Sequence, residues 1–184
     1  MIESEHKLIQ QAKQGESSAF GVLYDNYHEK IFRFVYFKVS HKEEAEDLTH
    51  QVFLNAWKNI RNYKDQNLPF SSWLYRIAKN KVIDYYRLKK NNTSLDSIKD
   101  SLHDDYNIEL ATEEILNLEN IRNAIKELNE DQQDVLIMRF IEDLPIKEVA
   151  TSLGKTESAV KLIQLRAIKK LKNIIKNGTD YITA

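Results

Sequence analysis

Residues 71–90 carry side chains suited to contact an unpaired nucleobase. Trp73, Arg76, Asn80 and Arg87 recur at helical spacing and share one stripe, away from the apolar positions of the same segment. An aromatic ring beside an amide and guanidinium groups can stack on a single-stranded base and hydrogen-bond to its edge. Spacing alone equally allows Trp73 to be an ordinary core residue.

A second segment, residues 155–176, holds seven Lys or Arg residues against the single acidic residue Glu157. Read as a helix, it buries a stripe through Val160 and Ala167 and presents a basic face on the other side. Its first turn offers free backbone amides to a phosphate, and its cationic side chains can reach base edges in a major groove. The candidate DNA-contacting residues are Thr156, Ser158, Lys161, Leu162, Leu165, Arg166 and Lys169. The alternative is a solvated lysine face.

A third pattern lies between residues 47 and 58, where helical spacing leaves Leu54 among the polar residues Asp47 and Gln51, with Trp57 at the border. An exposed apolar position rimmed by polar groups suggests a docking surface for another protein. Single exposed leucines are common, so one leucine is weak evidence for such a surface.

The sequence offers no catalytic or metal-binding pattern. It has no cysteine, its five histidines are scattered, and neither an HExxH motif nor a Gly-rich phosphate loop occurs. We therefore predict that the protein is not an enzyme and binds no cofactor. The lack of cysteine suits a reducing cytoplasm. A charged N-terminus and the lack of long apolar windows indicate neither an export signal nor a membrane span.

The elements that must position these residues are predicted to be helices, because only four glycines and two prolines interrupt 184 residues. The class is all-α. Periodicity predicts helices over Ser4–Lys13, Ser18–Val39 and about 40–63, the last opened by a capping box of Ser40 and Glu43.

Residues 62–70 should form a loop, after which Ser71 or Ser72 caps a basic helix ending near Lys90. Residues 91–117 are rich in Ser, Asp and Asn and predict a mobile connection, partly helical after Ile108.

A second helical unit follows this connection. Helices are predicted over 118–128, 132–141 and 146–153, with Asn129 capping the second of them. Gly154 then provides a turn, and Thr156 caps a long final helix. The last pair has the pattern of a helix-turn-helix, with a glycine in the turn and apolar residues that hold the second helix down.

Charge is segregated along the chain, although 27 basic and 28 acidic residues give a formal net charge of −1. Residues 1–90 hold 15 basic and 11 acidic residues, 91–117 hold 1 and 7, and 118–184 hold 11 and 10. The sequence therefore predicts two small helical domains, each with a basic helix, joined by a flexible acidic linker.

Two stretches resemble the extracytoplasmic-function (ECF) sigma factors of the bacterial sigma-70 family. The segment DLTHQVFLNAW, residues 47–57, is similar to the polymerase-docking helix of that family, and FSSWLYRIAKNKVIDYYR, residues 70–87, is similar to the helix after its promoter-melting loop. Residues 128–172 are similar to the C-terminal domain that binds the minus-35 element.

The resemblance implies a domain for docking and minus-10 recognition at 1–92, a linker at 93–117 and a minus-35 domain at 118–184. It implies core RNA polymerase and promoter DNA as partners and admits an anti-sigma factor, which exposed apolar positions such as Leu54 would allow to bind. Docking would use Asp47, Gln51, Leu54 and Trp57. A flipped minus-10 base would be held by Asn62, Tyr63, Lys64, Trp73, Arg76, Asn80 and Arg87.

The recognition helix departs from the family pattern. It reads VKLIQLR over residues 160–166, where the family commonly has a polar residue and an arginine after the first basic position. Ile163 should turn to the core, which leaves Leu162 and Leu165 facing outward. We hypothesise that these leucines meet thymine methyls or the sugar backbone and favour a minus-35 element rich in A and T.

Two rival functions stay open. A free-standing helix-turn-helix regulator would use the N-terminal half as a sensor or dimerisation module, but the stripe from Trp73 to Arg87 and the split basic charge speak against it. A decoy that occupies polymerase without reading DNA is disfavoured by Lys161, Arg166 and Asn80.

Overall fold

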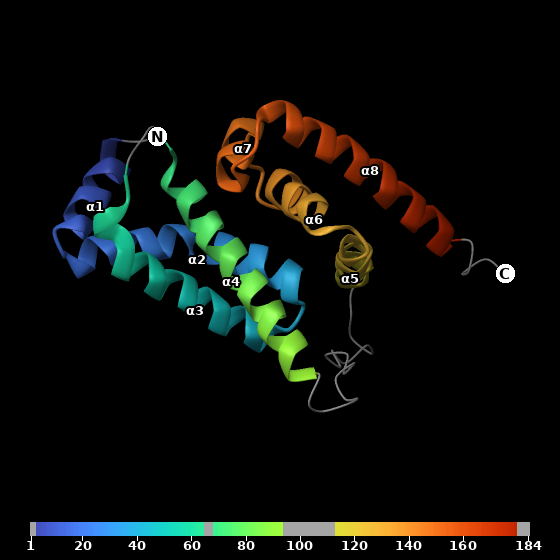
Figure 1. The fold of residues 1–184 in the computed structure, drawn as a ribbon, viewed down its shortest axis with the longest axis horizontal. Helices are drawn as coiled ribbons and strands as arrows, with labels where there is room; N and C mark the ends of the chain where they lie inside the picture. Colours follow the sequence, from blue (N-terminus) through green and yellow to red (C-terminus); the bar gives the residue numbers. More distant parts are fainter. Residues whose placement is uncertain (1–2, 65–67, 94–112, 180–184) are drawn as a thin grey trace.

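A computed structural model describes residues 3–64, 68–93 and 113–179, and throughout these ranges all regular structure is helical (Figure 1). The elements are α1 (Glu3–Lys13), α2 (Ser17–Val39), α3 (Lys42–Asn59), the 3-10 turn η1 (Ile60–Asn62), α4 (Phe70–Thr93), α5 (Glu113–Lys126), α6 (Glu130–Leu136), the π-helical turn η3 (Ile137–Ile141), α7 (Ile146–Leu153) and α8 (Glu157–Thr179). The predicted all-α class is confirmed.

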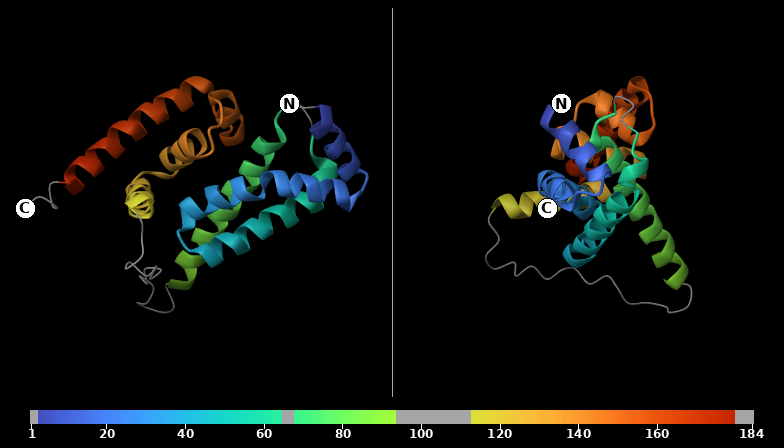
Figure 2. Two further views of the ribbon diagram at one scale, coloured as in Figure 1. Left: turned by 180° about the vertical axis from the view of Figure 1, so that it is seen from behind. Right: turned by 90° about the vertical axis from the view of Figure 1, so that its left-hand side faces the viewer.

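The helices form two groups in chain order. Helices α1–α4 pack together on one side, and α5–α8 lie against the α2–α4 side of that group, with α8 outermost (Figures 1 and 2). Residues 94–112, which include most of the predicted linker, lie outside the described residues. Helix α5 begins at Glu113, before the predicted start at residue 118.

The core follows the predicted apolar stripes but runs across both groups. Phe34 in α2 and Tyr75 in α4 belong to the same buried cluster as Ile137, Met138 and Val149 of the second group. A smaller cluster of Leu128, Leu136 and Ala167 fixes α8 onto the helices before it. The two groups are therefore packed against each other as well as internally.

The predicted capping box at Ser40 is wrong. Ser40 instead ends α2 in the left-handed conformation, with φ of 68°, and its N–H donates to the Tyr36 carbonyl at 2.8 Å. His41 precedes the first residue of α3 and makes no side-chain capping bond. Ser40 serves the end of one helix and is not available to start the next.

The predicted serine cap of α4 is also wrong, since the helix begins at Phe70 and both serines lie in its first turn. Their hydroxyls bond elsewhere: Ser71 Oγ donates to the Glu148 carboxylate and Ser72 Oγ to the Glu148 carbonyl. Asn59, at the end of α3, is exposed and its Nδ2 donates to the Asn55 carbonyl at 2.9 Å.

Three predicted signals in the second group are confirmed. Asn129 forms a capping box with Gln132, Gly154 ends α7 with φ of 63°, and Thr156 Oγ1 accepts from the Ala159 N–H at 3.2 Å. The predicted helix 132–141 is divided, because the Glu142 N–H bonds five residues back to Ile137 and produces η3.

Candidate nucleic-acid interface

Helices α7 and α8 have the geometry of a helix-turn-helix. Val149, Ala150 and Val160 are buried where the two helices meet, and the left-handed Gly154 turns the chain between them. A residue with a side chain would be strained at this φ, which explains the glycine. The turn is also held from α6, because Lys155 Nζ lies 2.9 Å from Asp131 Oδ2.

The outward side of α8 carries the predicted contact residues. Thr156, Ser158, Lys161, Leu162, Leu165, Arg166 and Lys169 are all exposed. Leu162 is 47% and Leu165 67% exposed, which is unusual for large apolar side chains, while Ile163 is half-buried against the core as predicted. The helix therefore offers a mixed cationic and apolar face.

A cavity of about 240 Å³ lies beside the start of α4. It brings together five of the residues predicted to hold a base, namely Asn62, Tyr63, Lys64, Trp73 and Arg76. The Trp73 ring is half-buried, with its centroid 5.0 Å from that of Tyr63 and 5.5 Å from that of Phe70. Trp73 therefore packs on the core and also lines the cavity, and its contact with a base stays a prediction.

The other predicted base-contacting residues lie apart from this cavity. Asn80 and Arg87 are exposed further along α4 and do not line it. Tyr63 is 5% exposed and its hydroxyl donates to the Leu68 carbonyl at 2.8 Å, so its ring forms the wall of the cavity and not an open stacking surface.

Sequence reasoning missed Thr151, which lines the same cavity from α7. Arg76 Nη2 donates to the Thr151 carbonyl at 2.9 Å, which joins the candidate base site to the helix-turn-helix. Positions 75 apart in the sequence give no periodic signal for this contact.

The predicted docking surface lies on the outer side of α3. Asp47, Gln51 and Leu54 are exposed, Leu54 to 57%, and Trp57 is half-buried with its ring centroid 4.9 Å from that of Phe20. The structure therefore brings these residues onto one helix face with Trp57 at its edge.

A cluster of ion pairs lies where α4 meets α6. Lys79 Nζ lies 2.9 Å from Asp134 Oδ2 and 3.5 Å from Asp131 Oδ1. Burial alone lowers the pKa of Lys79, but the two carboxylates more than offset this, so its pKa is raised. The hydrogen bond from Lys155 is the main cause that lowers the pKa of Asp131. Lys79 and Asp131 are therefore both held in their charged forms.

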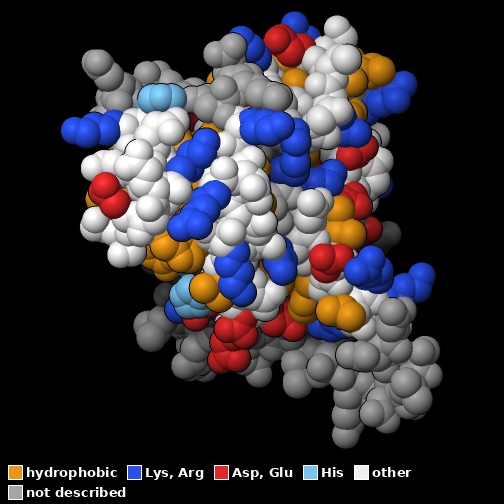
Figure 3. Space-filling model, turned by 60° about the vertical axis from the view of Figure 1, so that its left-hand side comes forward, with side chains coloured by type: hydrophobic (Ala, Val, Ile, Leu, Met, Phe, Trp, Pro, Cys, Tyr) orange, Lys and Arg blue, Asp and Glu red, His pale blue; other side chains and the backbone are white. Residues whose placement is uncertain are grey.

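Basic side chains also gather on the surface. Figure 3 shows Lys and Arg along the middle of one face, with Asp and Glu mostly toward its edges. No group of three or more His, Asp or Glu side chains within the described ranges could hold a metal ion. Over the same part of the chain, no helix has the length and apolar character needed to cross a membrane.

Comparisons with known families match both groups of helices. The Sigma-70 region 2 family matches residues 23–92, which cover most of α2 to α4, and the Sigma-70, region 4 family matches residues 124–173, which include the helix-turn-helix. The two matches contain the cavity and the outward face of α8, respectively.

Curated relatives and a solved structure agree with these matches. The chain is 31% identical to the ECF RNA polymerase sigma factor SigW of Bacillus subtilis, over 84% of this chain and 88% of SigW. It is 34% identical to the ECF RNA polymerase sigma factor BldN of Streptomyces coelicolor, over 92% of this chain but only 65% of BldN. The structure of CnrH in complex with the cytosolic domain of CnrY has the same fold, with a TM-score of 0.75 and 22% identity, over 95% of this chain and 99% of that one.

Proposed function

The chain belongs to the ECF sigma factors of the sigma-70 family, and we propose that it directs core RNA polymerase to specific promoters and assists DNA melting at the start of transcription. The observation that supports this most is the pairing of two different surfaces in one chain. One is the cavity with Trp73 and Arg76 at its wall, and the other is the cationic face of α8.

In this proposal, residues 1–92 dock on polymerase and bind the minus-10 element, 93–117 link the domains, and 118–184 bind the minus-35 element. The cavity holds a base flipped from the melted strand, with Trp73 available for stacking and Arg76 for hydrogen bonds. Lys161 and Arg166 contact base edges or phosphates in the major groove. The chain catalyses no reaction itself and acts in the cytoplasm.

Binding to DNA without polymerase should be weak. Because the protein has a net charge of −1, it displaces few counterions from DNA when it binds. Its affinity for the phosphate backbone should therefore be low. Leu54 and its polar neighbours on α3 would supply the contact with polymerase. An anti-sigma factor is a further proposed partner, in line with CnrH, which was solved with the cytosolic domain of another protein bound.

Run-off transcription tests the proposal. Core polymerase and genomic promoter fragments should give new transcripts only when the protein is added. Leu54→Arg should abolish them if α3 docks on polymerase, whereas Val22→Arg, at an exposed position of similar character on α2, should not. A free-standing regulator would instead shift promoter DNA in a gel without polymerase and give no polymerase-dependent transcripts.

A further inference from the structure

Two histidines that are far apart in the sequence meet in the fold. His28 in α2 and His50 in α3 have ring centroids 6.3 Å apart, and their ring planes are tilted by 39°. The two helices pack against each other within the first group. Because the residues belong to different helices, helical spacing could not show that the rings lie side by side.

Aromatic packing holds the ring of His28. Its centroid lies 4.8 Å from that of Tyr24 and 6.1 Å from that of Phe53, and it stacks on Phe32 with the planes 10° apart. His28 is half-buried by these contacts, whereas His50 is exposed. One ring is therefore already positioned, and the other can rotate toward a ligand that arrives from solvent. A site with one fixed group loses less conformational entropy on binding.

A pair of neutral imidazoles suits a divalent metal ion of intermediate softness. Imidazole nitrogen binds Zn²⁺, Ni²⁺ and Cu²⁺, with a Zn–N distance of about 2.0–2.1 Å. Two imidazoles on one tetrahedral zinc then have ring centroids about 5–6 Å apart. The centroids of His28 and His50 are at 6.3 Å, so a small rotation of the exposed His50 ring brings both nitrogens within reach of one ion.

The charge around the two rings is negative. Asp25 precedes His28 by three residues and Asp47 precedes His50 by three, so each exposed carboxylate shares a helix face with its histidine. Residues 42–51 hold four acidic residues and one basic residue. This field attracts a divalent cation. Within the described ranges no third His, Asp or Glu joins the pair as a ligand, so water would complete the coordination.

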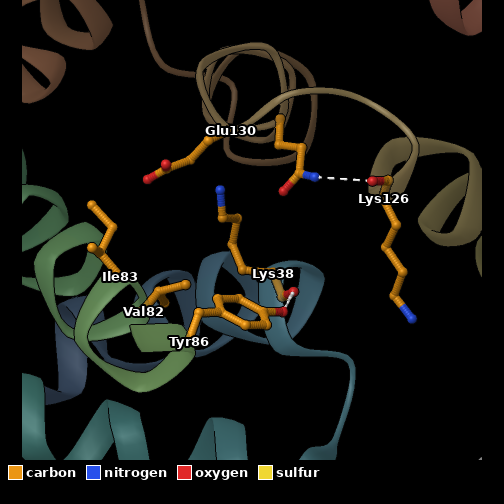
Figure 4. Close-up of a pocket in the computed structure, with 7 residues that line it drawn as sticks. Lys38, Val82, Ile83, Tyr86, Lys126 and Glu130 are labelled. Atoms are coloured by element: carbon orange, nitrogen blue, oxygen red, sulfur yellow. Dashed lines mark hydrogen bonds between the residues drawn. The ribbon is translucent and has the colours of Figure 1, made fainter. Parts of the chain in front are cut away.

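A cavity of about 500 Å³ between α4 and the turn from α5 to α6 has the opposite character. Figure 4 shows Lys38 extending toward Glu130, with Lys126 across the gap, and the lining includes no histidine. The Lys38 ammonium is already paired with Asp134 Oδ1 at 2.7 Å. Two lysines beside one carboxylate disfavour a divalent cation. The histidine pair is therefore the better candidate for a metal site.

We propose that His28 and His50 together bind one divalent metal ion such as Zn²⁺ or Ni²⁺, with water in the remaining coordination positions. The bound ion ties α2 to α3. It also lies beside the proposed docking surface, since His50 is about one helical turn before Leu54. The site does not depend on the proposed function, because the stability of the isolated protein reports on it directly.

Thermal unfolding of chelator-treated protein, with and without added Zn²⁺, tests the site. An ion that binds only the native state raises the Tm, so wild type should unfold at a higher temperature with zinc. His50→Gln and His28→Phe should lose this rise, the second with an aromatic ring still in place. His41→Gln also removes one imidazole, from a residue that makes no side-chain capping bond, and should keep the rise.

Titration calorimetry with Zn²⁺ measures the same site directly. Wild type and His41→Gln should bind one ion per chain. Loss of a ligand should weaken binding at least as much as loss of a group that only orients a ligand, so His28→Phe and His50→Gln should each lose at least about tenfold in affinity. If His28→Phe does not fold, His50→Gln decides, because His50 is exposed and its loss leaves the core intact.

Three results would overturn the proposal. The first is a Tm of wild type that zinc leaves unchanged. The second is a rise in His50→Gln equal to that of wild type, since the ion would then bind elsewhere. The third is an equal rise with Mg²⁺, which prefers oxygen ligands and would assign binding to the carboxylates instead of the imidazoles.

Discussion

Arg33 and Glu142 form a two-point ion pair across 109 positions of sequence, with Nε and Nη2 of the guanidinium at 3.0 and 2.9 Å from the two carboxylate oxygens. The Glu142 side chain is fully buried, whereas that of Arg33 is 37% exposed. Burial raises the pKa of Glu142 above 4.5, and the guanidinium offsets this only in part. The pair therefore contains one carboxylate that is costly to keep charged.

Stability should reflect this raised pKa. The native protein keeps the Glu142 proton to higher pH than the unfolded chain does, so the contribution is fully present below about pH 4.5 and is lost as pH rises through the raised pKa. In Glu142→Gln the side chain does not titrate, so this loss of stability with rising pH is absent. Urea unfolding at several pH values should show the stability of wild type relative to Glu142→Gln falling as pH rises, whereas the exposed control Glu157→Gln should show no such trend. A pH-independent difference for Glu142→Gln would contradict the prediction.

Two glycines should respond to alanine in opposite directions. Gly154 has φ of 63°, where an L-residue costs about 1–2 kcal/mol, so Gly154→Ala should lower the free energy of unfolding by that amount. Gly21 lies within α2, and a Cβ there would meet no atom within 4 Å. Gly21→Ala should raise the free energy of unfolding by about 0.5–1 kcal/mol. Urea denaturation of both variants measures the two changes in the free energy of unfolding. Changes of the same sign would contradict the prediction.

Affinity for the minus-35 element should depend on the cations of α8. Lys161→Ala or Arg166→Ala should each cost about 1–3 kcal/mol if the side chain makes a two-point base contact. Holoenzyme binding to promoter DNA is the measurement. Lys147→Ala, at an exposed lysine on α7, should change affinity little. If either variant loses no more affinity for promoter DNA than Lys147→Ala does, the substituted residue does not belong to the proposed site.

The exposed leucines should set base preference. Leu162→Arg replaces an apolar contact with a guanidinium that favours guanine, so the selected minus-35 sequence should lose thymine at the facing position. Selection from a randomised promoter library with holoenzyme measures this. Val22→Arg, 45% exposed against 47% for Leu162, controls for added charge. If Leu162→Arg selects the same minus-35 sequence as wild type, the proposed contact between Leu162 and a thymine methyl is wrong.

Local signals predicted the second group of helices well. Pro145 and Gly154 bound α7 at the predicted residues, because a proline favours a helix start and a left-handed glycine ends one. Asn129 and Thr156 could be assigned as caps because Asn and Thr are favoured at the start of a helix. The side-chain oxygen of each accepts from the backbone N–H three residues later. These signals lie within a few residues of one another.

The predicted helix caps at Ser40 and at Ser71 or Ser72 were wrong, because each serine has another role in the fold. Ser40 has the spacing of a capping box, but the left-handed end of α2 falls on the same residue. Ser71 and Ser72 are good capping residues, yet Glu148 in α7 offers them partners that sequence spacing does not show. Tertiary contacts decided both cases.

Helical periodicity could not predict the ion pairs between the two groups of helices. Lys38 follows helical spacing like any core position, but a lysine there predicts exposure unless its partner is known. That partner, Asp134, lies 96 positions away and also has to serve Lys79. The base cavity was partly predictable, because Trp73 and Arg76 share one helix stripe, whereas Thr151 reaches it only through the packing of α7 on α4.

The direction of charge across α4 and α6 also affects how quickly the protein can find a partner. Because Lys38, Lys79 and Arg33 are neutralised internally, long-range attraction of a polyanion has to come from the exposed cations of α8. This electrostatic steering can raise the association rate constant, and the gain would fade as ionic strength increases. Promoter search should therefore slow as salt is added.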